Sequence, residues 1–118
     1  MSRDLRRHDR LAVNYKVEMV WLNEHGETCF ARCMCKDISV SGMRLESPEP
    51  VPVRTYVNFH ISRLEFRGTG SVRSCVHKGM KYHLGVEFGG SLIGERLFQR
   101  ASKAQESELA TLPSVPVV

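Results

Sequence analysis

The sequence has no long hydrophobic run. No stretch reaches the roughly 18 consecutive apolar residues that cross a bilayer, and the first ten residues, MSRDLRRHDR, contain no hydrophobic signal core. These absences predict a cytoplasmic protein without membrane insertion. In that compartment the four cysteines are expected to be free thiols, because cytosolic reductants keep most thiols reduced.

The motifs of common catalytic and cofactor sites are also missing. Neither GxxxxGK[ST] nor GxGxxG occurs, and Gly68–Arg73, GTGSVR, lacks the third glycine and the strand-to-helix context of a phosphate loop. No Cys–His signature indicates a nucleophile, and no pair of carboxylates stands in a distinctive setting. We therefore expect a protein that is not an enzyme and has no cofactor.

A CxxC pair, the usual signature of a zinc site, is absent too. Cys29, Cys33 and Cys35 fall on one face of a single predicted strand, where residues two apart are separated by roughly 6.5 Å. That separation is long for two sulfurs on one tetrahedral ion. We expect these cysteines to be small buried side chains rather than metal ligands.

Net charge is only mildly positive. The 118 residues suit one domain, and 42% hydrophobic with 25% charged residues is an ordinary globular composition. The charge of +4 indicates a moderate preference for anionic partners. Four arginines against two aspartates give residues 1–10 a charge of +2, half of the total. These arginines are Arg3, Arg6, Arg7 and Arg10.

Apolar and polar residues alternate in six segments, which predicts short β-strands. They are Val13–Leu22, Thr28–Asp37, Met43–Glu46, Tyr56–Ile61, Leu64–His77 and Tyr82–Phe88. Leu64, Phe66, Val72 and Val76 are expected on one buried face of the fifth segment. Gly68 and Gly70 interrupt that segment and predict a bulge or bend. Six short strands predict an all-β fold, a closed or nearly closed six-stranded antiparallel barrel.

A C-terminal helix is predicted after the last strand. Ser91 is the expected N-cap, and the helix is expected to cover an opening or the side of the barrel with an apolar stripe. That stripe consists of Leu92, Ile93, Leu97, Phe98, Ala101, Ala104 and Leu109. The chain is thus divided into a flexible basic arm (1–11), a barrel (12–90), a helix (91–110) and a disordered tail (111–118).

The basic arm carries Arg6 and Arg10 four residues apart, so a helical turn or compact loop would present both to one target. Guanidinium groups bind phosphate oxygens, stack on bases and read the O6/N7 edge of guanine. The simpler interpretation of such a cluster is a charged terminus that faces solvent.

Residues 37–42, DISVSG, offer groups that arginine lacks. The Asp37 carboxylate can accept hydrogen bonds from N1–H and N2–H₂ of guanine, and the Ser39 hydroxyl can serve a phosphate or a base. Gly42 permits a positive φ and a close backbone approach. The simpler interpretation here is a turn, in which Asp, Ser and Gly are ordinary residues.

Together the two segments resemble the motif pair of the PilZ domain family, RxxxR followed along the chain by [D/N]xSxxG. RRHDR (6–10) and DISVSG (37–42) match both motifs, and GMRLES, GSVR and YHLGVEF also look like the family, over about residues 5–105. The resemblance implies a six-stranded barrel that binds cyclic di-GMP. Arg6 and Arg10 would clasp the ligand, Arg7 would add charge, Asp37 and Ser39 would contact guanine, and Gly42 would keep the turn.

The resemblance further implies a receptor that changes conformation on binding and signals through an unidentified protein effector. Two alternatives remain open: a small basic barrel that binds RNA or single-stranded DNA, and a PilZ-like docking module that binds no nucleotide. Nucleic acid is the less expected partner, because Phe30 and Trp21 are the only aromatic candidates for base stacking and Trp21 falls on the buried face. The role of Asp9 in the arm stays open.

Overall fold

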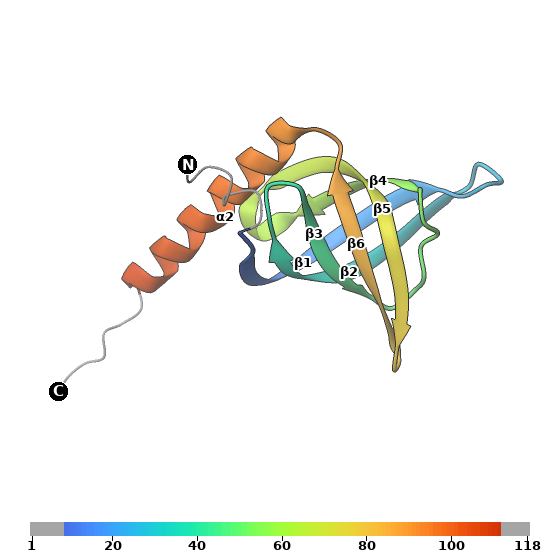
Figure 1. Cartoon of the computed structure of the whole chain (residues 1–118), viewed down its shortest axis with the longest axis horizontal. Helices are drawn as coiled ribbons and strands as arrows, with labels where there is room; N and C mark the ends of the chain where they lie inside the picture. Colours follow the sequence, from blue (N-terminus) through green and yellow to red (C-terminus); the bar gives the residue numbers. More distant parts are fainter. Residues whose placement is uncertain (1–8, 112–118) are drawn as a thin grey trace.

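The computed structural model describes residues 9–111, with side chains to residue 108, and contains a closed barrel followed by one long helix (Figure 1). The strands close in the order β1-β2-β3-β6-β5-β4, and every neighbouring pair is antiparallel. The prediction of a six-stranded antiparallel barrel with a C-terminal helix is confirmed. The elements are β1 (Leu11–Leu22), β2 (Thr28–Ile38), β3 (Gly42–Ser47), β4 (Tyr56–Ile61), the 3₁₀ helix η1 (Ser62–Leu64), β5 (Phe66–Lys78), β6 (Lys81–Phe88) and α2 (Ser91–Thr111).

Strict alternation of side chains explains how the strands form the core. In β1, Tyr15, Val17, Met19 and Trp21 are buried, while the residues between them are exposed. Strands with this period place one set of side chains inside a barrel and the other set in solvent. The predicted burial of Trp21 is confirmed, at 6% exposure.

Two of the cysteines in β2 also belong to the core. Cys33 and Cys35 are buried, and Cys29 is half-buried. Burial raises the pKa of the Cys33 thiol, and it raises the pKa of Cys35 to about 12. Both thiols are therefore protonated at neutral pH, as expected for small core side chains.

Strand β5 differs from its prediction. The strand begins at Phe66, because Leu64 lies in the 3₁₀ helix η1. Gly68 and Gly70 stay in regular register with β4, and the irregularity lies between Val72 and Ser74. The expected bulge at the glycines was therefore wrong.

Close packing accounts for those two glycines. A Cβ at Gly68 would lie 2.7 Å from the ring of Phe59, and one at Gly70 would lie 2.7 Å from the carbonyl oxygen of Glu87.

The irregularity after Val72 exchanges the buried and exposed faces in the rest of β5, because a one-residue shift reverses the two faces of a strand. Val76, predicted to be buried, is 48% exposed, while Cys75 packs against the core.

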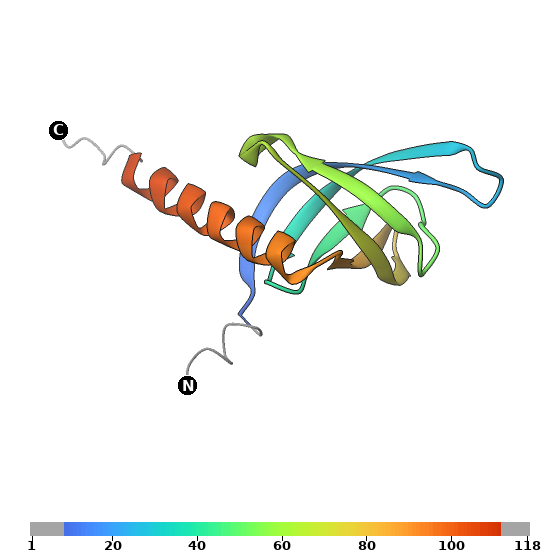
Figure 2. The same cartoon turned by 90° about the horizontal axis from the view of Figure 1, so that it is seen from above.

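Helix α2 lies across one end of the barrel and projects beyond it (Figure 2). Leu97 and Ala101 are fully buried, with Ile93, Phe98 and Ala104 partly buried beside them. Leu92 is 58% exposed, so its predicted place in the apolar stripe was wrong. Ser91, the expected cap, is already the first residue of the helix.

Helix α2 is tied to the barrel along its length. Gln105 donates to the carbonyl of Ala12 at 3.0 Å, and Arg100 donates to the carbonyl of Leu64 at 3.1 Å. At Gly94 the helix meets the β2–β3 turn so closely that a Cβ would lie 1.7 Å from the carbonyl oxygen of Val40. Within the described residues, no helix is both long and apolar enough to span a membrane.

Candidate ligand-binding site

Arg10 and Asp37 are in contact where β1 begins and β2 ends, although they are 27 positions apart in the sequence. Strand β1 begins directly after Arg10, and its first residues pair with the end of β2, where Ala12 faces Asp37. The Nε and Nη2 groups of Arg10 both donate to Oδ1 of Asp37, at 2.9 and 2.5 Å. The structure thus brings the second arginine of RxxxR into direct contact with the aspartate of DxSxxG.

The other arm arginines, Arg3, Arg6 and Arg7, lie outside the described residues. Of the predicted arm (1–11), the structure describes only residues 9–11, and of the predicted tail (111–118) it describes only Thr111. Contacts of Arg6 and Arg7 with a ligand therefore stay predictions.

A second cation, which sequence reasoning missed, also binds Asp37. Arg44 in β3 is the cross-strand partner of Asp37, and its Nε lies 3.4 Å from Oδ2. A signal for it was present in the sequence. The alternation in GMRLES points Arg44 outward, whereas its position opposite Asp37 depends on the register across the turn at Ser39–Ser41.

Ser39 supports the turn between β2 and β3 from inside. Its N–H donates to the carbonyl of Gly42 at 2.8 Å, and its Oγ accepts from the N–H groups of Ser41 and Gly42 at 3.3 and 3.2 Å. The residue is only 1% exposed. In this structure the hydroxyl serves the turn, and its direct contact with a ligand stays a prediction.

Gly42 is required by the neighbouring strand. A Cβ at this position would lie 2.3 Å from the carbonyl oxygen of Val86 in β6. The close backbone approach expected of Gly42 is present. The expected positive φ is not, because among the described residues the glycines with that conformation are Gly26 and Gly79.

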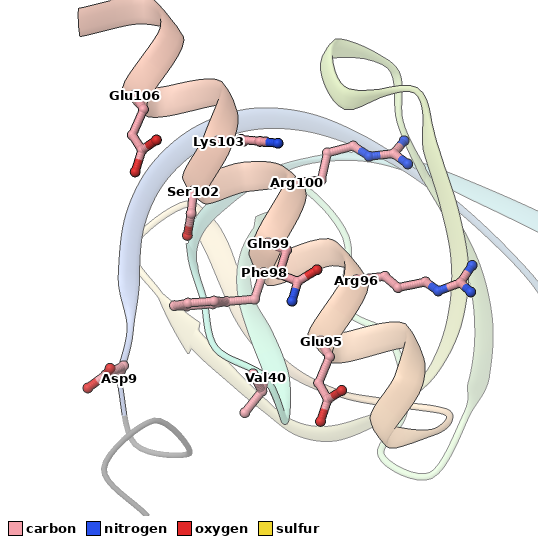
Figure 3. A pocket seen from close by; sticks show the side chains of 10 residues that line it. All are labelled: Asp9, Val40, Glu95, Arg96, Phe98, Gln99, Arg100, Ser102, Lys103 and Glu106. Carbon is pink, nitrogen blue, oxygen red and sulfur yellow. The ribbon is translucent and has the colours of Figure 1, made fainter. Parts of the chain in front are cut away.

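The turn stands between two depressions in the surface. The larger, of about 970 Å³, runs along α2 from Val40 and Asp9 toward Glu106 (Figure 3). The smaller, of about 560 Å³, is bounded by Ser41, Phe88 and the beginning of α2. A ligand held at the turn therefore has open surface on both sides of it.

Within the cluster of Arg10, Asp37 and Arg44 the net charge is positive, while Asp9, Glu87 and Glu95 line the depressions beside it. One carboxylate, with a side chain 20% exposed, faces two guanidinium groups whose side chains are 42% (Arg10) and 54% (Arg44) exposed. Guanidinium donors bind phosphate oxygens, and the carboxylate accepts N–H groups of a base. The arrangement can therefore bind a molecule that carries both phosphate and guanine.

The exposed aromatic surface relevant to the nucleic-acid alternative lies elsewhere. Phe30 is 47% exposed, and the Arg32 guanidinium lies 5.6 Å from its ring centre. Phe30 and Asp37 are seven positions apart along β2, roughly 23 Å of extended strand. Phe30 and Asp37 therefore do not form one stacking platform.

The fold and this corner define a small β-barrel domain with a cation–carboxylate site at the β2–β3 turn. The sequence profile of one family, the PilZ domain, matches residues 4–104 of this chain. The chain belongs to the PilZ domain family. A search of curated proteins found no match.

Solved structures of the same fold include two proteins. The PilZ domain of YcgR from Escherichia coli, determined with c-di-GMP, has a TM-score of 0.61 at 12% identity, covering 88% of this chain and 96% of that one. MrkH of K. pneumonia in its apo state has a TM-score of 0.60 at 14% identity, covering 84% of this chain and 52% of that one. The chain thus spans about half the length of MrkH. At these identities the likeness establishes the fold.

Proposed function

We propose that this protein is a receptor for cyclic di-GMP and has no enzymatic activity. The observation that carries the proposal is the contact between Arg10 and Asp37, at 2.5 Å. It joins the two PilZ motifs at one corner of the barrel, and both motifs are complete in this chain. The YcgR domain of the same fold was determined with c-di-GMP, which supports the same choice of ligand.

In the proposed complex, the arm supplies cations and the turn supplies the acceptor. Arg10, together with Arg6 and Arg7, binds the two phosphates and the guanine edges, and Asp37 accepts from the N1–H side of a guanine. A good bidentate base contact contributes about 1–3 kcal/mol, and stacking contributes about 1–3 kcal/mol per base. Contacts of this kind, together with the attraction between the arginines and the two phosphates, would offset the cost of association and bring the affinity toward the micromolar range.

The output would be a change of shape read by another protein. Moving Arg10 from Asp37 to the ligand rearranges the arm at a turn that touches α2 through Val40 and Gly94. We propose that this altered surface is recognised by a protein effector in the cytoplasm, where the ligand is a second messenger.

Calorimetric titration of the full chain with cyclic di-GMP, cyclic di-AMP and GTP tests the proposal. We expect saturable binding of cyclic di-GMP at micromolar concentration and much weaker binding of the other two. Cyclic di-AMP has the same phosphates but an amino group in place of the guanine O6, so it isolates base recognition. Absence of heat from cyclic di-GMP at high concentration would refute the proposed receptor.

A further inference from the structure

Arg44 holds the same carboxylate as Arg10 but through the other oxygen. Both donor groups of Arg10 bind Oδ1 of Asp37, whereas Arg44 Nε lies 3.4 Å from Oδ2. The carboxylate is therefore shared between a cation that precedes the barrel and a cation that belongs to it.

The two cations differ in how firmly the chain fixes them. Arg44 pairs with Asp37 in β2 on one side and with Gly85 in β6 on the other. Its neighbours Met43 and Leu45 are 2% and 0% exposed, which anchors the strand and directs Arg44 outward. Arg10 precedes the first residue of β1. A ligand can displace Arg10 without breaking the strand ladder, but it cannot displace the backbone of Arg44.

Given the proposed receptor function, we propose that Arg44 is a positioning and specificity residue of the cyclic di-GMP site. When the nucleotide draws Arg10 away from Oδ1, Arg44 stays at Oδ2 and keeps the carboxylate in place. Each carboxylate oxygen has more than one acceptor position. Asp37 can thus accept from a guanine while Oδ2 remains bound to Arg44.

The chemistry of guanine fits this pair. Asp37 accepts from N1–H and N2–H₂, and Arg44, directly beside it, can donate to the adjacent O6. Adenine presents an amino group at the corresponding position, which a guanidinium donor cannot bind. The Arg44 side chain is 54% exposed, and its partner on β6, Gly85, has no side chain to cover it. Arg44 is therefore accessible and favours guanine over adenine.

The test compares Arg44→Gln with Arg32→Gln in the full chain. Arg32 is another exposed strand arginine, far from the turn, so this control removes the same charge. We expect Arg44→Gln to weaken cyclic di-GMP binding by roughly tenfold, the loss of one good base contact, and to narrow its preference over cyclic di-AMP. Arg44→Lys, which keeps the charge but not the planar fork, should have an intermediate effect, and Arg32→Gln should have little.

If Arg44 had a purely structural role, Arg44→Gln would lower the melting temperature of the protein. Exposed arginine–aspartate pairs stabilise folds little, so the melting temperature of Arg44→Gln should stay close to that of the control. In an Asp37→Asn background, Arg44→Gln should reduce the affinity for cyclic di-GMP by a smaller factor than it does in the wild-type background, because the two residues act together.

The outcomes separate the inference from the function on which it rests. If the wild-type chain does not bind cyclic di-GMP, the receptor proposal fails. If the wild type binds, and Arg44→Gln binds as tightly and as selectively as Arg32→Gln, the role of Arg44 is overturned while the receptor proposal stands. Should Arg44→Gln fail to fold, Arg44→Lys decides the question, and unchanged affinity in that variant would overturn the inference.

Discussion

The arginines and the proposed ligand compete for the carboxylate of Asp37. In this structure its Oδ1 accepts from Arg10 and its Oδ2 lies beside Arg44, whereas the proposed complex requires it to accept from guanine. Hydrogen bonds between charged groups are stronger than neutral ones, so releasing Arg10 costs free energy. The phosphates of the ligand offset that cost, because they give the released guanidinium a new anionic partner.

Replacing Arg10 tests this exchange. Arg10→Ala should lower the affinity for cyclic di-GMP by at least roughly tenfold, the value of one good contact. The fold should be unaffected, because an exposed ion pair contributes little to stability. Calorimetry measures the affinity, and circular dichroism shows whether the barrel is intact. Unchanged affinity in a folded variant would remove Arg10 from the site.

The β2–β3 turn is closely packed on two sides. Its end at Gly42 lies against the backbone of β6, and its tip at Val40 lies against Gly94 of α2. The strand ladder and the helix thus fix the backbone position of the motif. In the proposed complex, the acceptor groups would therefore be positioned before the ligand arrives, which would lower the entropy cost of binding.

Gly42→Ala measures how tight this contact is. Its new Cβ would lie 2.3 Å from the Val86 carbonyl oxygen, and overpacking of this kind typically costs about 1–3 kcal/mol. Urea unfolding should show a loss of that size. Gly90→Ala is the matched control, because its Cβ meets no atom within 4 Å, and it should lose less than about 1 kcal/mol. Equal losses in the two variants would contradict the steric account.

Alternation of residue types predicted most of the elements. It located all six strands to within two residues, because one face of each strand is buried. In β5 it misplaced the irregularity, which lies after Val72 and not at Gly68 or Gly70, since a glycine needed for close packing and a glycine in a bulge look alike in sequence. It also missed the pairing of Asp37 with Arg44, because that pairing depends on the register across the turn, which no single strand specifies.

For the whole molecule, buried thiols make stability depend on pH. The folded state raises the pKa of Cys35 to about 12, mainly because burial penalises the thiolate, whereas an unfolded thiol has a pKa of about 8.5. A raised pKa in the folded state favours folding below the unfolded pKa, and this contribution is lost as the pH rises toward 12. Cys33, whose pKa is also raised, acts in the same direction.

The free energy of unfolding should therefore fall between about pH 8.5 and pH 12, by at most about 1.4 kcal/mol per pH unit for each thiol. Cys35→Ala should reduce that slope, and the half-buried Cys29→Ala should leave it closer to the wild type. Urea unfolding at several pH values measures the slopes. Identical slopes in all three proteins would show that Cys35 ionises as easily in the folded state as in the unfolded state.

At the scale of the whole molecule, the proposed site and the β5–β6 hairpin lie in different parts of the domain. The motif turn lies at the end of the barrel where α2 packs, while the β5–β6 hairpin projects away from it (Figure 1). A ligand gripped by the arm and the turn should therefore affect only one end of the domain.

A nitrogen–proton correlation spectrum, recorded while cyclic di-GMP is added to the labelled full chain, tests this location most directly. We predict saturable shifts in the amides of Ile38–Gly42 and Arg44, with the amides of Gly79 and Met80 at the tip of the β5–β6 hairpin unchanged. A spectrum that does not respond to cyclic di-GMP, or one that responds at the hairpin tip and not at the turn, would contradict the account.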